Sequence, residues 1–140
     1  MKYKSVIIGI ISLIVIVSCD NLSDINYNQE YVIPVTKTVK TSDKKYVIRF
    51  DSVFTDSRCP SDVVCVWAGI GGAKFTILDK DSSSQTFKLY TDTNSELKWS
   101  DSAMYKDIKI KLLKLTPYPS TANPIKYEDY KAKIIITKID

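Results

Sequence analysis

Apolar residues recur at every second position through most of this chain, and this spacing limits the possible folds more than any other feature. The alternation is clearest in residues 46–51, 73–78, 87–90, 108–112 and 131–136. Successive side chains of a β-strand point to opposite faces of a sheet, so a period of two predicts strands. No window has the apolar period of a helix of three turns. The sequence therefore predicts an all-β protein.

The segments between these strands favour an antiparallel arrangement. They are mostly short and polar, and a longer one carries three prolines between residues 117 and 124. No helix is predicted that could cross over between parallel strands. Residues 31–39 are expected to form the first strand, with Pro34 restricting it to a sheet edge or a bulge.

The run of Leu112, Leu113 and Leu115 bears on the choice between two antiparallel architectures. Apolar residues begin to appear here on both faces of one strand, which suits a strongly curved sheet that changes the face it buries. We therefore expect a small closed antiparallel β-barrel. An Ig-like β-sandwich is the alternative.

The first nineteen residues predict where the protein is located. Two lysines precede an apolar run at residues 6–17, which is too short to span a bilayer comfortably. The run ends in Ile-Val-Ser-Cys, the pattern of a bacterial lipobox, with Cys19 as the acylated residue. We expect a signal peptide at 1–18 and a protein anchored by lipid in the cell envelope, at the outer membrane, facing the periplasm or the surface. An N-terminal membrane helix with an incidental cysteine is the alternative.

The mature chain is expected to consist of a lipidated tether at 19–30 and a single domain at 31–140. Residues 20–30 are mostly polar, and about 110 residues suffice for one core but not for two. Loss of Lys2 and Lys4 with the signal peptide lowers the formal net charge from +4 to +2. This charge is too small and too dispersed to predict binding to nucleic acid.

Cys59 and Cys65 remain as an even pair once Cys19 is assigned to the lipid. Disulfides form in the oxidising compartments outside the cytoplasm, so we expect the two to be joined. Five residues separate them, instead of the two of a thioredoxin-like redox motif, which favours a structural disulfide over a catalytic one.

The absence of histidine excludes several classes of enzyme. Serine and cysteine hydrolase triads normally need an imidazole, and most zinc sites use at least one. Carboxylate chemistry remains open, but no sequence pattern pairs its candidate residues, which are Asp51, Asp56, Asp62, Glu128 and Asp129. We expect no enzyme activity, no cofactor and no metal ion of the protein's own.

Two motif-like segments and two tryptophans have structural interpretations. The glycines at 69, 71 and 72 predict a bulge or tight turn, and residues 79–84 predict a polar hairpin turn instead of a calcium loop. Trp67 is expected in the core. For Trp99 a buried position that closes the barrel is favoured over a role as a surface anchor.

Residues 56–69 place two cysteines, a proline, an arginine and a tryptophan in one loop and strand. Together with residues 113–119 and 130–136, this segment resembles a group of small secreted bacterial lipoproteins that includes the potempins, protein inhibitors of secreted metallopeptidases. The likeness covers most of residues 46–139. It implies an OB-like β-barrel and a loop that enters a peptidase cleft without being cleaved.

The resemblance also implies an inhibitory loop and two partners, a secreted metallopeptidase and the lipid bilayer. Arg58, Val63 and Val64 would fill subsites of the peptidase, and Asp56, Asp62 or a backbone carbonyl would approach its metal. The alternatives are a disulfide that only staples one end of the barrel, with Arg58 exposed, and a non-catalytic binding or structural lipoprotein. The complete expected loop is Asp56, Ser57, Arg58, Cys59, Pro60, Ser61, Asp62, Val63, Val64 and Cys65.

Overall fold

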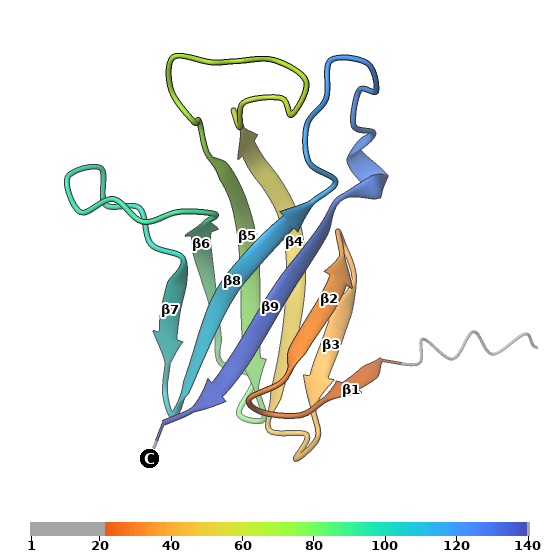
Figure 1. Cartoon of the computed structure of the whole chain (residues 1–140). Coiled ribbons are helices and arrows are strands. Elements are labelled where there is room, and N and C mark those ends of the chain that lie inside the picture. Colours follow the sequence, from red (N-terminus) through yellow and green to blue (C-terminus); the bar gives the residue numbers. More distant parts are fainter. Residues whose placement is uncertain (1–21, 140) are drawn as a thin grey trace, which may run out of the picture.

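The computed structural model describes residues 22–139, and nearly every element in them is a strand (Figure 1). The predicted signal peptide and Cys19 lie outside the described residues. The elements are β1 (Ser23–Ile25), β2 (Glu30–Pro34), β3 (Thr38–Thr41), β4 (Tyr46–Asp56), β5 (Gly71–Asp79), β6 (Ser84–Tyr90), β7 (Ser102–Tyr105), β8 (Ile108–Thr116), the 3-10 turn η1 (Tyr127–Asp129) and β9 (Lys131–Lys138). The all-β prediction is confirmed.

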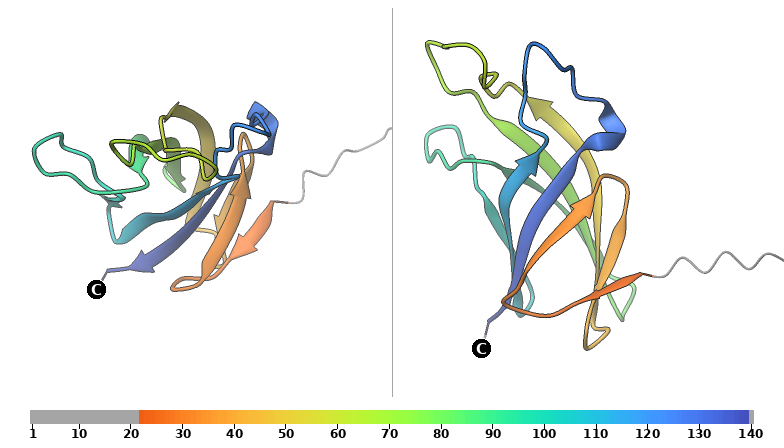
Figure 2. Two further views of the ribbon diagram at one scale, coloured as in Figure 1. Left: turned by 45° about the horizontal axis from the view of Figure 1, so that its top comes forward. Right: turned by 45° about the vertical axis from the view of Figure 1, so that its right-hand side comes forward.

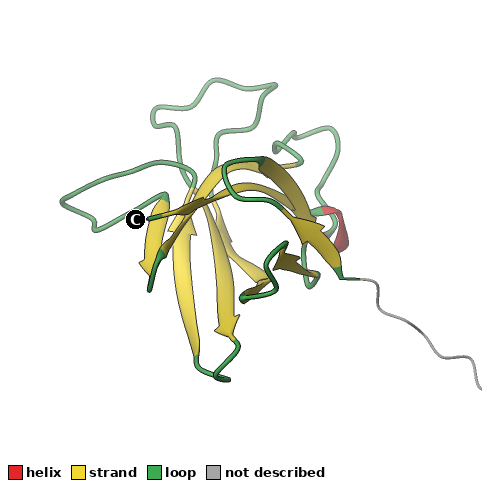
Figure 3. Ribbon diagram, turned by 90° about the horizontal axis from the view of Figure 1, so that it is seen from below, coloured by secondary structure: helices red, strands yellow, loops and turns green. Residues whose placement is uncertain are grey.

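The strands pair in two sheets that surround one interior (Figure 3). One sheet has the order β1-β3-β4-β5-β6 and the other has the order β2-β9-β8-β7. Neighbouring strands are antiparallel except for β1 and β3, which run parallel, against the expectation of a purely antiparallel fold. The reason is that β2 lies between them in the chain but belongs to the other sheet. The chain reverses direction once into β2 and again into β3, so β3 runs in the same direction as β1.

The chain passes from one sheet to the other at residues 35–37, which makes the sandwich barrel-like. The N–H of Val35 donates to the Tyr130 carbonyl at 2.8 Å, whereas the N–H of Thr36 donates to the Phe50 carbonyl of the other sheet at 2.7 Å. Thr36 has a φ of 67°, a left-handed conformation that breaks a strand. The predicted single strand at 31–39 is therefore wrong: it is two strands in two sheets, and Pro34 ends the edge strand β2.

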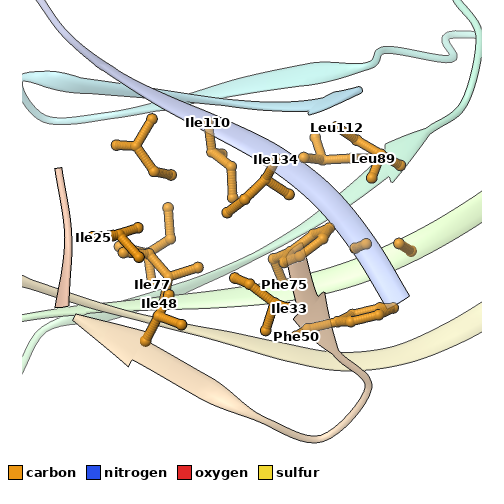
Figure 4. Close-up of a cluster of buried hydrophobic side chains, with 14 of the residues drawn as sticks. Ile25, Ile33, Ile48, Phe50, Phe75, Ile77, Leu89, Ile110, Leu112 and Ile134 are labelled. Atoms are coloured by element: carbon orange, nitrogen blue, oxygen red, sulfur yellow. The ribbon is translucent and has the colours of Figure 1, made fainter. Parts of the chain in front are cut away.

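The core is made by the inward-facing residues of the predicted alternation (Figure 4). A bulge in β8 between Leu112 and Lys114 changes the buried face, so that Leu112 and Leu115 both point inward while Leu113 is exposed. The change of buried face expected from this run is thereby confirmed. The main contributors are Ile48, Phe50, Phe75, Ile77, Leu89, Ile108, Ile110, Ile134 and Ile136.

Part of the segment predicted to be a tether belongs to the domain. Ile25 is 1% exposed, and β1 pairs with residues 39–41 of β3. The Ile25 carbonyl also accepts the N–H of Ser42 at 2.8 Å. One large apolar residue in a polar segment is enough to attach β1 to the core, so the boundary expected between residues 30 and 31 is wrong. Within residues 22–139, no helix has the length and apolar character needed to cross a membrane.

Candidate binding surface at the loop end

Three loops meet at one end of the two sheets (Figure 2). Strands β4, β6 and β8 run toward this end and β5, β7 and β9 return from it, so the three connections lie side by side (Figure 1). We call residues 57–70 the cysteine loop, residues 91–101 the tryptophan loop and residues 117–130 the proline loop. The predicted inhibitory residues all lie in the cysteine loop or at the end of β4, which precedes it.

The cysteine loop is closed by the predicted disulfide. Cys59 and Cys65 are bonded, with their Cα atoms 5.9 Å apart. Between the strands and the disulfide, two backbone hydrogen bonds continue the pairing of β4 with β5. The Cys59 N–H donates to the Ala68 carbonyl at 2.9 Å, and the Ser57 N–H donates to the Ile70 carbonyl at 2.8 Å. The loop is therefore a hydrogen-bonded extension of β4 and β5 with a covalent ring at its tip.

Arg58 fastens this loop to β8 and is 7% exposed. Its guanidinium makes two hydrogen bonds to the Asp56 carboxylate, each 2.7 Å long. It also donates to the carbonyls of Leu115 at 2.6 Å and Pro117 at 3.0 Å, and lies over the Tyr118 ring at 4.9 Å. The expectations of an exposed Arg58, or of one that fills a partner's subsite, are therefore wrong. All three guanidinium nitrogens donate hydrogen bonds inside the domain.

Asp56 is equally engaged, because it also accepts the Tyr130 hydroxyl at 2.8 Å. Burial works to raise the pKa of the Asp56 carboxyl, but the hydrogen bonds from Arg58 and Tyr130 outweigh it and hold the pKa below its ordinary value. Burial and the same carboxylate raise the pKa of Tyr130 to about 12. Asp56, Arg58 and Tyr130 thus form a hydrogen-bonded cluster between β4, the cysteine loop and the proline loop, in which the Asp56–Arg58 ion pair is buried and the Tyr130 ring is partly buried.

Asp62 joins the tip of the cysteine loop to the proline loop. Its carboxylate accepts the Thr121 hydroxyl at 2.6 Å, the Thr121 N–H at 3.0 Å and the Ser120 hydroxyl at 3.1 Å. These hydrogen bonds, that from the Thr121 hydroxyl first, lower the pKa of the Asp62 carboxyl well below its ordinary range. Both carboxylates expected to approach a partner's metal are therefore hydrogen-bonded inside the domain. Of the groups expected in that role, the backbone carbonyls remain.

Four apolar residues of the cysteine loop point into solvent. Val64 is 101% exposed, Val66 is 95% exposed and Trp67 is 74% exposed, and Val63 is also exposed. The predicted burial of Trp67 is wrong, because this part of the loop extends beyond the ends of both sheets. We call Val63, Val64, Val66 and Trp67 the apolar tip.

A hollow of about 460 Å³ separates the cysteine loop from the tryptophan loop. Trp99 is half-buried in the wall of this hollow and stacks on Tyr90, with the ring centroids 5.6 Å apart. It is therefore neither a fully buried core residue nor a fully exposed surface anchor, the two positions expected from the sequence. Gly69 permits the narrow neck of the cysteine loop: its φ is 67°, and a Cβ there would lie 1.7 Å from the Ser57 carbonyl oxygen. The residues that line the hollow are Ser57, Trp67, Ala68, Gly69, Ile70, Asp92 and Trp99.

A second hollow of about 280 Å³ lies on the other side of Gly69 and Asp92. Its wall includes Arg58, Tyr118 and residues 113–115 of β8. Sequence reasoning identified the disulfide ring but neither hollow. Comparisons with protein-family models, with curated proteins and with solved structures found no match.

Proposed function

We propose that this protein is a lipid-anchored inhibitor of a secreted peptidase, and that the cysteine loop enters the peptidase's cleft. The observation that carries the proposal is a loop restrained at three places, with an apolar tip left free. The disulfide closes its ring, Arg58 ties its base to β8, and Asp62 ties its side to the proline loop.

Such a loop loses little conformational entropy when it binds. Ordering a flexible loop costs roughly 0.5–1.5 kcal/mol for each immobilised side chain, so rigidity in the free state improves affinity. A few residues near the centre of an interface supply most of its binding energy, and tryptophan is enriched among them. The apolar tip therefore provides the contact, and the restraints behind it limit the entropic cost.

The same restraints make the loop a poor substrate. Pro60 lacks a backbone N–H, so at this position the loop cannot donate the backbone hydrogen bond that an extended substrate gives to a peptidase. A cut between Cys59 and Cys65 would leave both ends joined by the disulfide. The metallopeptidase class comes from the resemblance of residues 56–69 to the potempins.

The predicted anchor suits this role, because the strand that follows it, β1, lies far from the cysteine loop. Ser23, the first residue of β1, stands four positions after Cys19, a reach of at most about 14 Å. β1 lies at the end of the domain opposite the three loops (Figure 1). β4 runs from one end toward the other with 11 residues, roughly 35 Å at the usual rise per residue. The anchor would therefore hold the apolar tip well above the membrane.

A binding or structural subunit of a surface complex is the second candidate, since an apolar tip also suits a permanent partner. Stoichiometric inhibition separates the two. A soluble domain of residues 20–140, which keeps every described strand and the whole core, is titrated against metallo-, serine and cysteine peptidases. We expect inhibition of a metallopeptidase with an end point at one inhibitor per enzyme. Failure to inhibit any peptidase of the panel would contradict the inhibitor proposal.

The apolar tip is tested in the same assay with two matched variants. Val64→Ser should weaken inhibition, whereas Val32→Ser, which replaces an exposed valine of β2, should leave it unchanged. Equal inhibition by both variants would show that binding uses another surface.

A further inference from the structure

We propose that the hollow between the cysteine loop and the tryptophan loop is a subsite for a cationic side chain, above all an arginine, of the bound protein. The proposal rests on the proposed function, because it names what the partner places beside the apolar tip. It is carried by two indoles and one carboxylate that share the hollow's lining: Trp67, Trp99 and Asp92.

Asp92 is the only charged residue among those that line the hollow. Its Oδ1 accepts the N–H of Thr93 at 2.8 Å. Within residues 22–139 it takes part in no salt bridge, although the neighbouring hollow also contains Lys114. The hollow therefore offers one carboxylate without an internal cation, and its charge is complementary to a cationic group.

The Trp99 indole is a supported wall of the hollow. Trp99 is held by reciprocal backbone hydrogen bonds with Asn94, of 2.8 and 3.0 Å, and by its stacking on Tyr90. Tyr90 in turn packs edge-on against Phe54, with the ring centroids 5.4 Å apart. Indole is the ring that binds cations best, and a guanidinium can stack on it while donating to a carboxylate in the same plane. This row of supported rings gives the subsite a fixed wall.

The other polar groups of the hollow argue against a sugar, the alternative ligand that tryptophans commonly stack on. The Ser57 hydroxyl donates to the Ile70 carbonyl at 3.2 Å and accepts the Ile70 N–H at 3.1 Å. The Ala68 and Ile70 carbonyls already accept backbone N–H groups. A sugar needs several hydrogen-bonding partners, whereas a guanidinium needs an acceptor and an aromatic face.

The composition of the chain makes the test direct. The sequence contains two tryptophans, and both line this hollow, so intrinsic fluorescence reports on it. The full protein, purified in a mild detergent, is titrated with N-acetyl-arginine methylamide. Parallel titrations use the corresponding glutamate amide and methyl β-glucoside. We expect a saturable change in emission with the arginine amide, and none with the other two probes.

Asp92→Asn removes the charge and keeps the shape. It should raise the dissociation constant of the arginine amide about tenfold or more, the usual loss for a charge-assisted hydrogen bond. The matched control is Asp81→Asn, an exposed carboxylate in the β5–β6 turn at the opposite end of the domain, which should bind as the parent does. The proposal is overturned if the arginine amide gives no saturable change, if methyl β-glucoside gives it instead, or if Asp92→Asn binds equally well.

This assay contains no peptidase, so its outcome is separate from that of the proposed function. If the parent inhibits a peptidase and Asp92→Asn inhibits it equally, the inhibitor function stands and the arginine subsite fails. If the arginine amide binds through Asp92 but no peptidase is inhibited, the subsite stands and serves a partner of another class.

Discussion

The guanidinium of Arg58 and the carboxylate of Asp56 form a bidentate ion pair in which neither side chain is more than 9% exposed. Buried pairs of this kind are held by their further hydrogen bonds, because removal of one partner leaves the other charged and desolvated. Here those further bonds lead to Leu115, Pro117 and Tyr130, so the pair joins three segments of the chain. The position of the cysteine loop depends on it.

Arg58→Met should therefore be strongly destabilising. It leaves Asp56 buried without its cation, and we expect a loss of about 3–5 kcal/mol in the free energy of unfolding. Arg49→Met, which breaks the more exposed pair with Asp51, should cost at most about 1 kcal/mol. Urea denaturation of both variants measures the difference. Equal costs would mean that the Arg58 pair adds nothing beyond a surface contact.

Stability should fall in acid through Asp56. Its pKa is lower in the folded protein than in the unfolded chain, so the unfolded state binds the proton first as the pH falls. The stabilisation is complete above the ordinary aspartate pKa and is lost as the pH drops through the folded value. Asp56→Asn should flatten the dependence of unfolding free energy on pH below about 4. An unchanged slope in this variant would assign the acid sensitivity to other carboxylates.

Tyr130 should show the opposite dependence in alkali. Its folded pKa of about 12 lies above the ordinary tyrosine value of 10.0, so its contribution is complete below pH 10 and is lost as the pH rises toward 12. Ultraviolet titration of tyrosine ionisation in the parent and in Tyr130→Phe isolates this group. The difference between the two curves should lie near pH 12 instead of pH 10.

The disulfide should matter more for binding than for folding. Replacing Cys59 and Cys65 together by serine opens a small ring, whose closure contributes roughly 2 kcal/mol to stability. The freed tip must then be ordered at each binding event, so peptidase inhibition should weaken further than the loss of stability explains. Thermal unfolding and inhibition are measured on the same preparation. Parallel losses would identify the disulfide as a staple of the barrel end.

Trp67→Ala should be nearly neutral for folding, because the indole is mostly exposed. We expect a change in unfolding free energy of less than about 0.5 kcal/mol and a clear loss of target binding. Phe50→Ala, in the core, provides the contrast with an expected cost of about 3–5 kcal/mol. A large loss of stability on truncating Trp67 would place its indole in the core after all.

The class of fold and the inward-facing residues could be predicted from local patterns alone. Alternation in residues 46–51 and 108–112 correctly identified the buried positions, because the two faces of a strand differ in their access to water. The Leu112–Leu115 run correctly indicated a change of buried face. The disulfide followed from the number of cysteines. A strand was wrongly predicted through Thr36, because periodicity does not report a left-handed backbone.

The candidate site could be predicted only in part, since most of its contacts join distant segments. The Asp56–Arg58 pair had a local signal, because residues two apart at a strand end point to the same side. The acceptors that bury Arg58 lie 57 and 59 positions along the chain, and the Thr121 hydroxyl that donates to Asp62 lies 59 positions from it. Trp67 and Asp92 share a hollow only because β4, β6 and β8 all end at one edge of the molecule. Sequence by itself determined which residues alternate and which cysteines remain to pair, since both depend on neighbours or on counting. Tertiary structure alone decided which polar groups are hydrogen-bonded inside the domain and which apolar side chains are exposed to solvent, because both depend on which loops the sheets bring together.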